Sequence, residues 1–338
     1  MMKKGLSFHV IFMLLMLVGL GSVPIFITDQ YFIHATAMVI LFAYLACAWN
    51  IIGGFVGSLS LGHAVYFGLG AYVSTVLSLE YQISPWIGLI PAAIIPAIVA
   101  WVLGFPSFRV RGPYFGLTTI AFAGILQIWV MNTEMLFGIP IRGARGLMVQ
   151  LKGNDPAMFQ FLDKSIYYWI ILIALIGIIY FTYRLRSSRQ GFYMLAVCGD
   201  ENAAAASGIN VLRTKLLANC VSAAFTGMGG VFYAQMVLFV DPARVLGIDL
   251  SIEIAVLSII GGRGTIWGPV FGAFLLRSIS EIVQITLGGS YLGVHLTVYG
   301  LVLIVSILYM PQGIYGFLAS VWSRMKYLRT RNEEGNKG

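Results

Sequence analysis

The sequence predicts an all-α, polytopic integral membrane protein: a helical bundle of about 10 membrane segments, some of them broken or short. Its 338 residues are 59% hydrophobic and only 10% charged, with a mean hydropathy of +0.88. A soluble chain of this size cannot cover so much apolar surface, which excludes an ordinary cytosolic enzyme, a disordered chain and a disulfide scaffold. The apolar residues form long unbroken runs, unlike the weak alternating segments of a membrane β-barrel.

Ten apolar runs supply the expected segments. The first follows Lys3 and Lys4, is too long for a signal peptide and has no small-x-small cleavage site, so we expect it to be retained. The eighth has about eleven residues, too few to cross ~30 Å of hydrocarbon as a straight helix. It is therefore expected to be a half-span, a re-entrant piece or a broken helix. The runs are Leu6–Thr28, Ile33–Ile52, Leu61–Leu79, Pro85–Leu103, Pro113–Met131, Ile166–Tyr183, Leu216–Val240, Leu250–Ile260, Thr265–Leu287 and Val294–Met310.

The basic residues favour a cytoplasmic location for both termini. With that orientation the inner segments hold fifteen of the 21 Lys and Arg residues, the outer segments hold five, and Arg277 lies within a span. This bias follows the positive-inside rule. The net charge of +8 is accordingly expected to face anionic membrane lipid, with no nucleic acid as partner. The three cysteines show neither zinc spacing nor a disulfide framework, and no metal or cofactor is expected.

We expect one transmembrane domain, residues 1–319, followed by a charged cytoplasmic tail, residues 320–338. Two long polar segments interrupt the domain. Residues 132–165 form an external loop rich in glycine and charge, and residues 184–215 form a cytoplasmic segment.

Two glycine-rich segments, Gly53–His63 and Gly261–Pro269, interrupt apolar sequence at membrane depth. Lipid tolerates irregular backbone only where protein or a water-filled cavity surrounds it. The first segment is either a plain cytoplasmic turn with close helix packing or a discontinuous helix that faces a transport pathway. The second has a similar glycine pattern, which reflects either chance among 39 glycines or a matching element in a second half of the chain. The candidate pathway residues are Gly57, Ser58, Ser60, Gly62, His63, Gly261, Gly262, Gly264, Thr265, Gly268 and Pro269.

Spacing within the second segment makes a further prediction. Gly264, Gly268 and Gly272 repeat every four residues, which places them on one face of a helix. A neighbouring helix is expected to approach closely along that face.

A short helix is predicted in the cytoplasmic segment. Asp200 can cap it, Glu201 suits its first turn, four alanines propagate it and Gly208 can end it. The helix is either a solvated surface element or a docking element for a cytoplasmic partner.

Four ionisable residues lie at membrane depth, where such groups usually face the protein interior or water. Arg277 and Glu281 are four residues apart and are expected to pair on one helix face. Glu253 lies near the start of the eighth segment, where the helix dipole favours a carboxylate. We interpret these three as mainly structural. His63 either satisfies a local hydrogen bond or carries protons.

Motifs of nucleotide binding and hydrolysis are absent from the sequence. It contains no G-x-x-x-x-G-K-[ST], no H-E-x-x-H and no G-x-S-x-G. We therefore expect no enzyme activity, and any ATP hydrolysis would come from another chain.

Four stretches carry a family resemblance: Gly57–Tyr72, Arg111–Phe122, Gly191–Asn210 and Gly261–Pro269, in this order. Together they resemble the permeases of branched-chain amino acid ABC importers, and the long N-terminal segment and basic tail resemble the longer of the two permeases. The sequence departs from the family pattern at Ser58, where glutamine is common. It departs again at Cys198-Gly199, where an Arg-Glu pair is frequent.

This resemblance implies a permease subunit that works by alternating access in a bacterial or archaeal inner membrane. Its partners would be a second related permease, two cytoplasmic ATP-binding subunits and an extracytoplasmic solute-binding protein. The implied cargo is a branched-chain or other hydrophobic amino acid, and urea, amides or another small solute are alternatives. The ATP-binding subunits would dock on residues that include Gly191, Ala196, Asp200, Glu201, Ala203, Ala204 and Gly208. The available apolar lining consists of Leu59, Leu61, Phe67, Tyr72, Phe115 and Trp267.

Two rival functions come from other classes. An ion-gradient-driven secondary transporter would use His63 or Glu253. An intramembrane enzyme would depend on His63 or His295.

Overall fold

The computed structural model describes residues 19–27, 29–109, 114–136, 138–151 and 153–287, together with four single positions at 300, 304, 313 and 316. Most of the expected first segment, the tenth segment and the tail at 320–338 lie outside this part of the chain. The helices are α2 (Gln30–Asn50), α3 (His63–Tyr81), α4 (Pro85–Ser107), α5 (Tyr114–Asn132), α6 (Lys164–Arg186), α7 (Arg189–Gly199), α8 (Glu201–Ala206), α9 (Val211–Val237), α10 (Pro242–Val245), α11 (Ile248–Gly262) and α12 (Gly268–Leu287).

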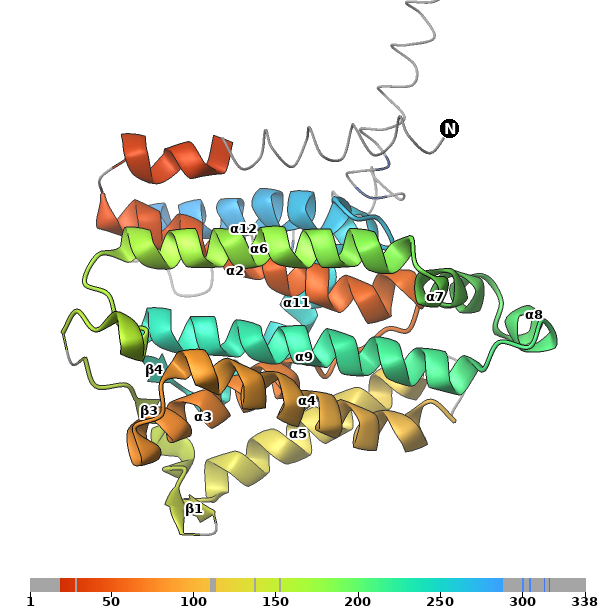
Figure 1. Ribbon diagram of the computed structural model, residues 1–338, viewed down its shortest axis with the longest axis horizontal. Helices are drawn as coiled ribbons and strands as arrows, with labels where there is room; N and C mark the ends of the chain where they lie inside the picture. The colour runs from red at the N-terminus through yellow and green to blue at the C-terminus, as the bar shows by residue number, and fades with distance from the viewer. Residues whose placement is uncertain are drawn as a thin grey trace, which may run out of the picture.

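The long helices run roughly along one axis, which gives the bundle two distinct ends (Figure 1). Helices α7 and α8 form one of them, called here the α7–α8 end. The other, called the loop end, is formed by residues 133–163 with strand β4 (Phe239–Val240). At the loop end β1 (Met135–Leu136) pairs antiparallel with β2 (Ile139–Pro140), and β3 (Leu147–Met148) pairs antiparallel with β4.

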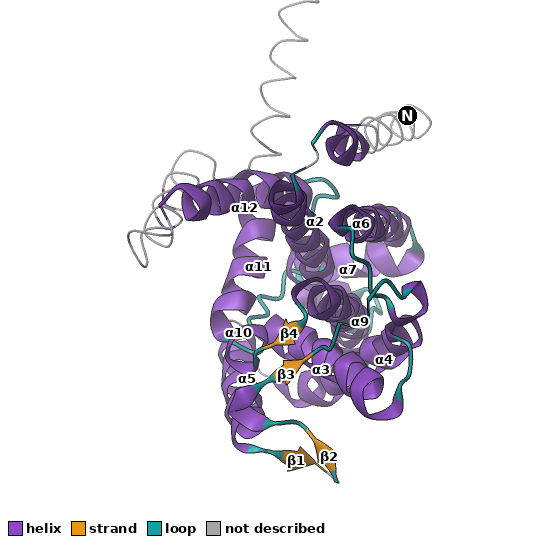
Figure 2. Cartoon of the chain, turned by 90° about the vertical axis from the view of Figure 1, so that its left-hand side faces the viewer, coloured by secondary structure: helices purple, strands orange, loops and turns teal. Residues whose placement is uncertain are grey.

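Helix α9 packs against several neighbours through its glycines. Figure 2 looks along the bundle from the loop end and shows α9 between α2, α3, α4 and α6. A Cβ atom at Gly227 would overlap the carbonyl oxygen of Ala92 in α4, and one at Gly230 would overlap that of Phe67 in α3. Small residues let helix backbones approach this closely. The resulting van der Waals packing stabilises helix association in lipid, where the hydrophobic effect does not drive it.

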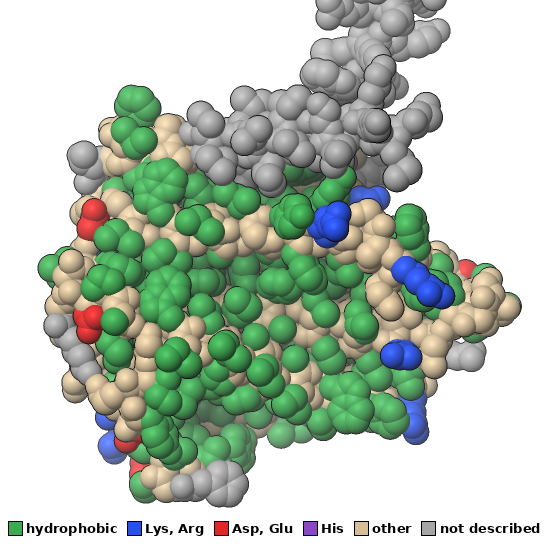
Figure 3. Space-filling model, in the orientation of Figure 1, with side chains coloured by type: hydrophobic (Ala, Val, Ile, Leu, Met, Phe, Trp, Pro, Cys, Tyr) green, Lys and Arg blue, Asp and Glu red, His purple; other side chains and the backbone are tan. Residues whose placement is uncertain are grey.

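Six helical stretches among the described residues are long and apolar enough to cross a membrane. They are Gln30–Phe55, Pro85–Ser107, Tyr114–Asn132, Lys164–Arg186, Val211–Val237 and Pro242–Gly262. Apolar side chains cover the face that includes α4, α6 and α9, and Lys and Arg gather toward the α7–α8 end (Figure 3). Ile90, Ile94 and Ile98 of α4 are each more than half exposed, as expected of a face turned to lipid.

Two helices of the bundle, α3 and α12, are not among these six stretches. Buried hydroxyl side chains, those of Ser74 and Thr75 among them, lower the hydropathy of α3. Such side chains fit a helix that packs against protein on most sides. The structure thus has the expected helical fold, with helices suited to cross a membrane. Within the described part of the chain, six of the ten expected segments are long and apolar enough to do so.

The eighth expected segment is a broken helix. Helices α10 and α11 follow each other across Leu246 and Gly247, and the stretch Pro242–Gly262 has 21 residues. The expected length of about eleven residues is therefore wrong. Asp241 caps α10 by accepting from the backbone N–H of Ala243, so the helical stretch begins before Leu250.

Three charged side chains join α11 and α12 beside α2. Arg277 lies 2.8 Å from Glu281, which confirms the expected pair, and 2.6 Å from Glu253 in the preceding helix. Its guanidinium carbon also lies 4.2 Å from the ring centroid of Phe42 in α2. The planar guanidinium therefore serves both carboxylates and one aromatic face.

Replacing Arg277 with methionine leaves two carboxylates close together without their cation. We expect the free energy of unfolding to fall by about 3 kcal/mol, the lower end of the range for a broken buried pair, because the side chains keep 15–23% of their surface exposed. Reversible unfolding in mixed detergent micelles measures this change. Arg277→Lys is the matched control and should lose much less stability. An unchanged unfolding midpoint for Arg277→Met would show that the cluster contributes nothing to stability.

Candidate functional site

The two glycine-rich segments meet at the end of α2, and the side chain of Asn50 joins them. Its Nδ2 donates to the carbonyl oxygen of Thr265 at 2.7 Å, and its Oδ1 accepts from the backbone N–H of Gly264 at 2.8 Å. A Cβ atom at Gly54 would overlap both this amide and the Gly264 nitrogen. The close approach therefore requires glycine at position 54, and one buried amide satisfies the backbone of the opposite turn.

The first glycine-rich segment begins where the regular α-helix changes to a wider helical turn. After Asn50 the chain forms a π-helical turn, η1 (Ile51–Phe55), whose five residues are buried, and then runs without regular structure to the start of α3. Trp49 Nε1 donates to the carbonyl oxygen of Ser60 at 2.7 Å and holds this stretch against α2. The helix is therefore discontinuous, and the residues after it form a connection at the α7–α8 end.

The second segment is a tight turn between α11 and α12. The hydroxyl of Thr265 donates to the carbonyl oxygen of Gly262 at 2.6 Å and accepts from the backbone N–H of Gly268 at 2.9 Å, which caps α12. The expectation that Gly264 shares a helix face with Gly268 and Gly272 is wrong, because α12 begins only at Gly268 and Gly264 lies in the turn with φ +74°. Gly268 and Gly272 do bring the backbones of α12 and α11 together, as predicted.

His63 has hydrogen-bond partners on both ring nitrogens and is fully buried. The Ser222 hydroxyl donates to the carbonyl oxygen of Ala48 at 2.7 Å, so it accepts from Nε2–H of His63 at 2.8 Å. Nδ1 then accepts from the Ser60 hydroxyl at 3.0 Å. This arrangement matches the interpretation of His63 as a residue that satisfies local hydrogen bonds, and it joins α3, α9 and α2.

The predicted short helix is present as α8. Asp200 Oδ1 accepts from the backbone N–H of Ala203 at 2.8 Å, and Gly208 follows the helix with φ +83°. Glu201 pairs with Lys215 of α9 at 2.5 Å, and this ion pair fastens α8 to the bundle.

Helix α7 packs against the broken end of α2, and α8 packs against α7 and α9. Met194, Val197 and Ala204 are buried in the cluster that holds Ile51 and Phe55 of η1. The expected partner-facing set needs correction at Gly191 and Ala204, because both are buried within this chain. A Cβ atom at Gly191 would overlap the carbonyl oxygens of the last turn of α6. The remaining expected residues are exposed: Ala196, Asp200, Glu201, Ala203 and Gly208.

Cys198 at the end of α7 touches the first glycine-rich segment. Its Sγ lies 3.9 Å from the carbonyl oxygen of Gly54, and a Cβ atom at Gly57 would lie 3.0 Å from that sulfur. Helix α7 is therefore in direct contact with the discontinuity in α2.

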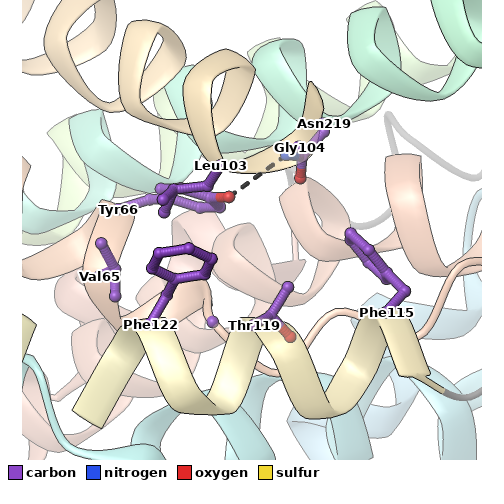
Figure 4. A pocket seen from close by; sticks show the side chains of 9 residues that line it. Val65, Tyr66, Leu103, Gly104, Phe115, Thr119, Phe122 and Asn219 are labelled. Carbon is purple, nitrogen blue, oxygen red and sulfur yellow. Dashed lines mark hydrogen bonds between the residues drawn. The ribbon is translucent and has the colours of Figure 1, made fainter. Parts of the chain in front are cut away.

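The expected apolar lining is not gathered around one space. Phe67, Tyr72 and Trp267 are buried in the main core, and Leu59 is 47% exposed. Phe115 lines a cavity of about 10 Å³, the size of one water molecule. Figure 4 shows this cavity with Tyr66 and Asn219 hydrogen-bonded on one side and Thr119 opposite. Of the expected pathway residues only Gly62 lines it, so the described helices are closely packed here.

Asn50 is the residue that sequence reasoning missed. It is the only amide in the second expected segment, Ile33–Ile52, and an amide at membrane depth needs a partner. The sequence therefore indicated that Asn50 needs a partner. It could not identify the partners, because they lie 214 and 215 residues further along the chain.

Glycine-interrupted, discontinuous helices inside an apolar helical bundle are typical of membrane transport proteins. The chain belongs to the family described as "Branched-chain amino acid transport system / permease component", which matches residues 31–307. This confirms the family resemblance.

Over their aligned residues, the relatives are about a quarter identical to this chain. The high-affinity branched-chain amino acid transport system permease protein LivM of Escherichia coli is 24% identical over 86% of this chain and 71% of its own length. The probable branched-chain amino acid transport permease protein LivH of Methanocaldococcus jannaschii is 25% identical over 77% and 82%. The L-arabinose ABC transporter permease protein AraH of Azospirillum brasilense is 24% identical over 68% and 69%. LivM is the longer permease, as the resemblance implied. No solved structure matches the chain.

The contact between α7 and α2 predicts a cross-link. A Cβ atom at Gly57 would lie 3.8 Å from Cys198 Cβ, the mean separation in disulfides. We expect Gly57→Cys to form a disulfide with the native Cys198 on mild oxidation, although the left-handed backbone there costs about 1–2 kcal/mol. Peptide mass spectrometry under non-reducing conditions detects the bond. Gly57→Cys combined with Cys198→Ala is the control. Two free thiols after oxidation would contradict the contact.

Proposed function

We propose that this chain is the transmembrane permease subunit of an ATP-driven importer of branched-chain and other hydrophobic amino acids. The observation that carries the proposal is the packing of α7, with α8 against it, onto the broken end of α2 in a chain of this family. An element that an external motor moves must touch the part of the membrane domain that changes shape. Here Met194 and Val197 touch η1, and Cys198 touches Gly54.

Motion would pass from α7 to both glycine-rich segments. A shift of α7 would displace η1, which directly follows Asn50, and the amide of Asn50 is bonded to the turn between α11 and α12. Close-packed elements of this kind transmit displacement because the protein interior contains few voids that could absorb it. The expected pathway residues, from Gly57 to His63 and from Gly261 to Pro269, lie along this connection, which supports their role in alternating access.

The orientation follows from the same assignment. Two ATP-binding subunits would dock in the cytoplasm on the exposed face of α7 and α8, where Phe192 is 63% exposed and Ala196, Ala203 and Ala205 are also exposed. Lys and Arg gather at this end, as the positive-inside rule requires. Both termini would then be cytoplasmic, in a bacterial or archaeal inner membrane. The loop end would face a solute-binding protein outside the cytoplasm. A second related permease would lie beside this chain in the membrane.

The names of the relatives bear on the cargo. LivM and LivH are named for branched-chain amino acids, which supports that class of solute. AraH is named for L-arabinose, which keeps another small solute, such as urea or an amide, as the alternative within this family. The hydrogen bonds on both nitrogens of His63 support a structural residue over the proton carrier of a secondary transporter.

Reconstitution into proteoliposomes tests the proposed function. We expect uptake of L-leucine only when the second permease, the ATP-binding subunits, a loaded binding protein and ATP are all present, because this chain carries no phosphate-binding motif. The oxidised Gly57→Cys variant should lose uptake, and a reductant should restore it, because the disulfide fixes α7 to α2. Uptake by this chain alone under an imposed ion gradient would overturn the proposal.

A charge on the exposed face of α8 should disrupt docking. Ala205→Glu adds charge and bulk where the partner is proposed to pack, so we expect the ATP-binding subunits to be lost on co-purification while the permease stays folded. Ala204→Glu is not a suitable test, because the buried charge would damage the bundle itself. Asn132→Glu, at the far end of α5, is the matched control. Equal recovery of the ATP-binding subunits with Ala205→Glu would remove the docking assignment.

A further inference from the structure

A cavity of about 160 Å³ lies at the loop end, where α2, α6 and α9 come together. It is far larger than the water-sized cavity beside Phe115 and compares with an apolar protein cavity that holds benzene. Apolar side chains form most of its wall, and four residues with polar groups join them. The lining residues are His34, Ala37, Leu151, Phe161, Leu162, Lys164, Tyr167, Gln235, Met236 and Leu238.

Gln235 is the unusual residue of this wall. Its side chain is 1% exposed, and neither amide atom has a hydrogen-bond partner among the described residues. An orphaned buried amide costs stability, because both of its polar groups have lost water without gaining another partner. A ligand that brings one donor and one acceptor would satisfy it.

The other polar groups set the charge of that ligand. The hydroxyl of Tyr167 is already occupied, because it donates to the carbonyl oxygen of Phe159 and accepts from the N–H of Phe161. His34 and Lys164 form no side-chain hydrogen bond or ion pair within the described ranges, so the cavity offers a cation to a carboxylate. The nearby Asp163 does not line the cavity. It caps α6 instead, and the N–H of Ser165 holds the pKa of its carboxyl below the usual value.

We propose that this cavity is a subsite for the amino acid solute on its way into the permease. Gln235 would bind the ammonium and carboxylate groups, Lys164 would attract the carboxylate, and the apolar wall with Ala37 and Met236 would hold the aliphatic side chain. This inference rests on the proposed function, which places the loop end on the side where solute arrives. The residues that line the cavity are separate from the glycine-rich crossing.

Two substitutions test the subsite by readouts that a structural role does not produce. Gln235→Leu removes the orphaned amide at similar volume, so we expect a more stable protein with at least tenfold lower uptake of L-leucine. Ala37→Val narrows the apolar wall by two methyl groups, so uptake of L-leucine should fall about tenfold relative to L-alanine. Gln127→Leu, on α5 and outside the cavity, is the control for both.

The measurements use the complete importer in proteoliposomes, with the binding protein loaded separately with each amino acid. Unfolding midpoints in detergent are recorded for the same variants. A Gln235→Leu variant with uptake within twofold of the unsubstituted protein, or an Ala37→Val variant with an unchanged leucine-to-alanine ratio, overturns the subsite and leaves the importer function intact. Absence of ATP-dependent uptake by the unsubstituted importer overturns both.

Discussion

The structure depends on one constraint: backbone that leaves regular helix at membrane depth must find its hydrogen-bond partners within the protein. The break after α2 meets this constraint through two adjacent side chains. Trp49 donates to Ser60 within the same segment, and Asn50 serves both the N–H of Gly264 and the carbonyl of Thr265 in the opposite one. Each unsatisfied group would cost several kcal/mol in hydrocarbon. Two glycine-rich segments can therefore coexist in this bundle because they lie against each other.

The same packing makes the crossing responsive to the α7–α8 end. Glycine at 54 and at 264 removes the side-chain layer that normally separates two elements, so displacement on one side reaches the other through backbone contact. Helix α7 contacts this junction, and α8 is fixed to α9 by the ion pair between Glu201 and Lys215. A chain of direct contacts therefore leads from an exposed surface to the interior, which is the physical requirement for an externally driven gate.

Local features of the fold could be predicted from the sequence, because they depend on neighbouring residues. The cap at Asp200 and the pairing of Arg277 with Glu281 follow from spacing alone. Features set by packing between distant segments could not be predicted. The inward orientation of Ala204 depends on where α9 and η1 lie, and the contact of Glu253 with Arg277 depends on the turn between α11 and α12. The length of the eighth segment could not be predicted, because α10, which Asp241 caps, extends the helical stretch back to Pro242, ahead of the apolar run.

His63 and Gln235 show how satisfaction of hydrogen bonds separates structural from functional polar residues. Both are fully buried, and both lie on helices at the centre of the bundle. His63 has a partner on each nitrogen, so its burial is offset within the fold itself. The amide of Gln235 has none among the described residues, and its cost is not offset there. A hydrophobic residue of the same size would stabilise the helix junction more. In the subsite proposed here, the amino acid solute bound in the adjoining cavity would supply the partner that Gln235 lacks among the described residues.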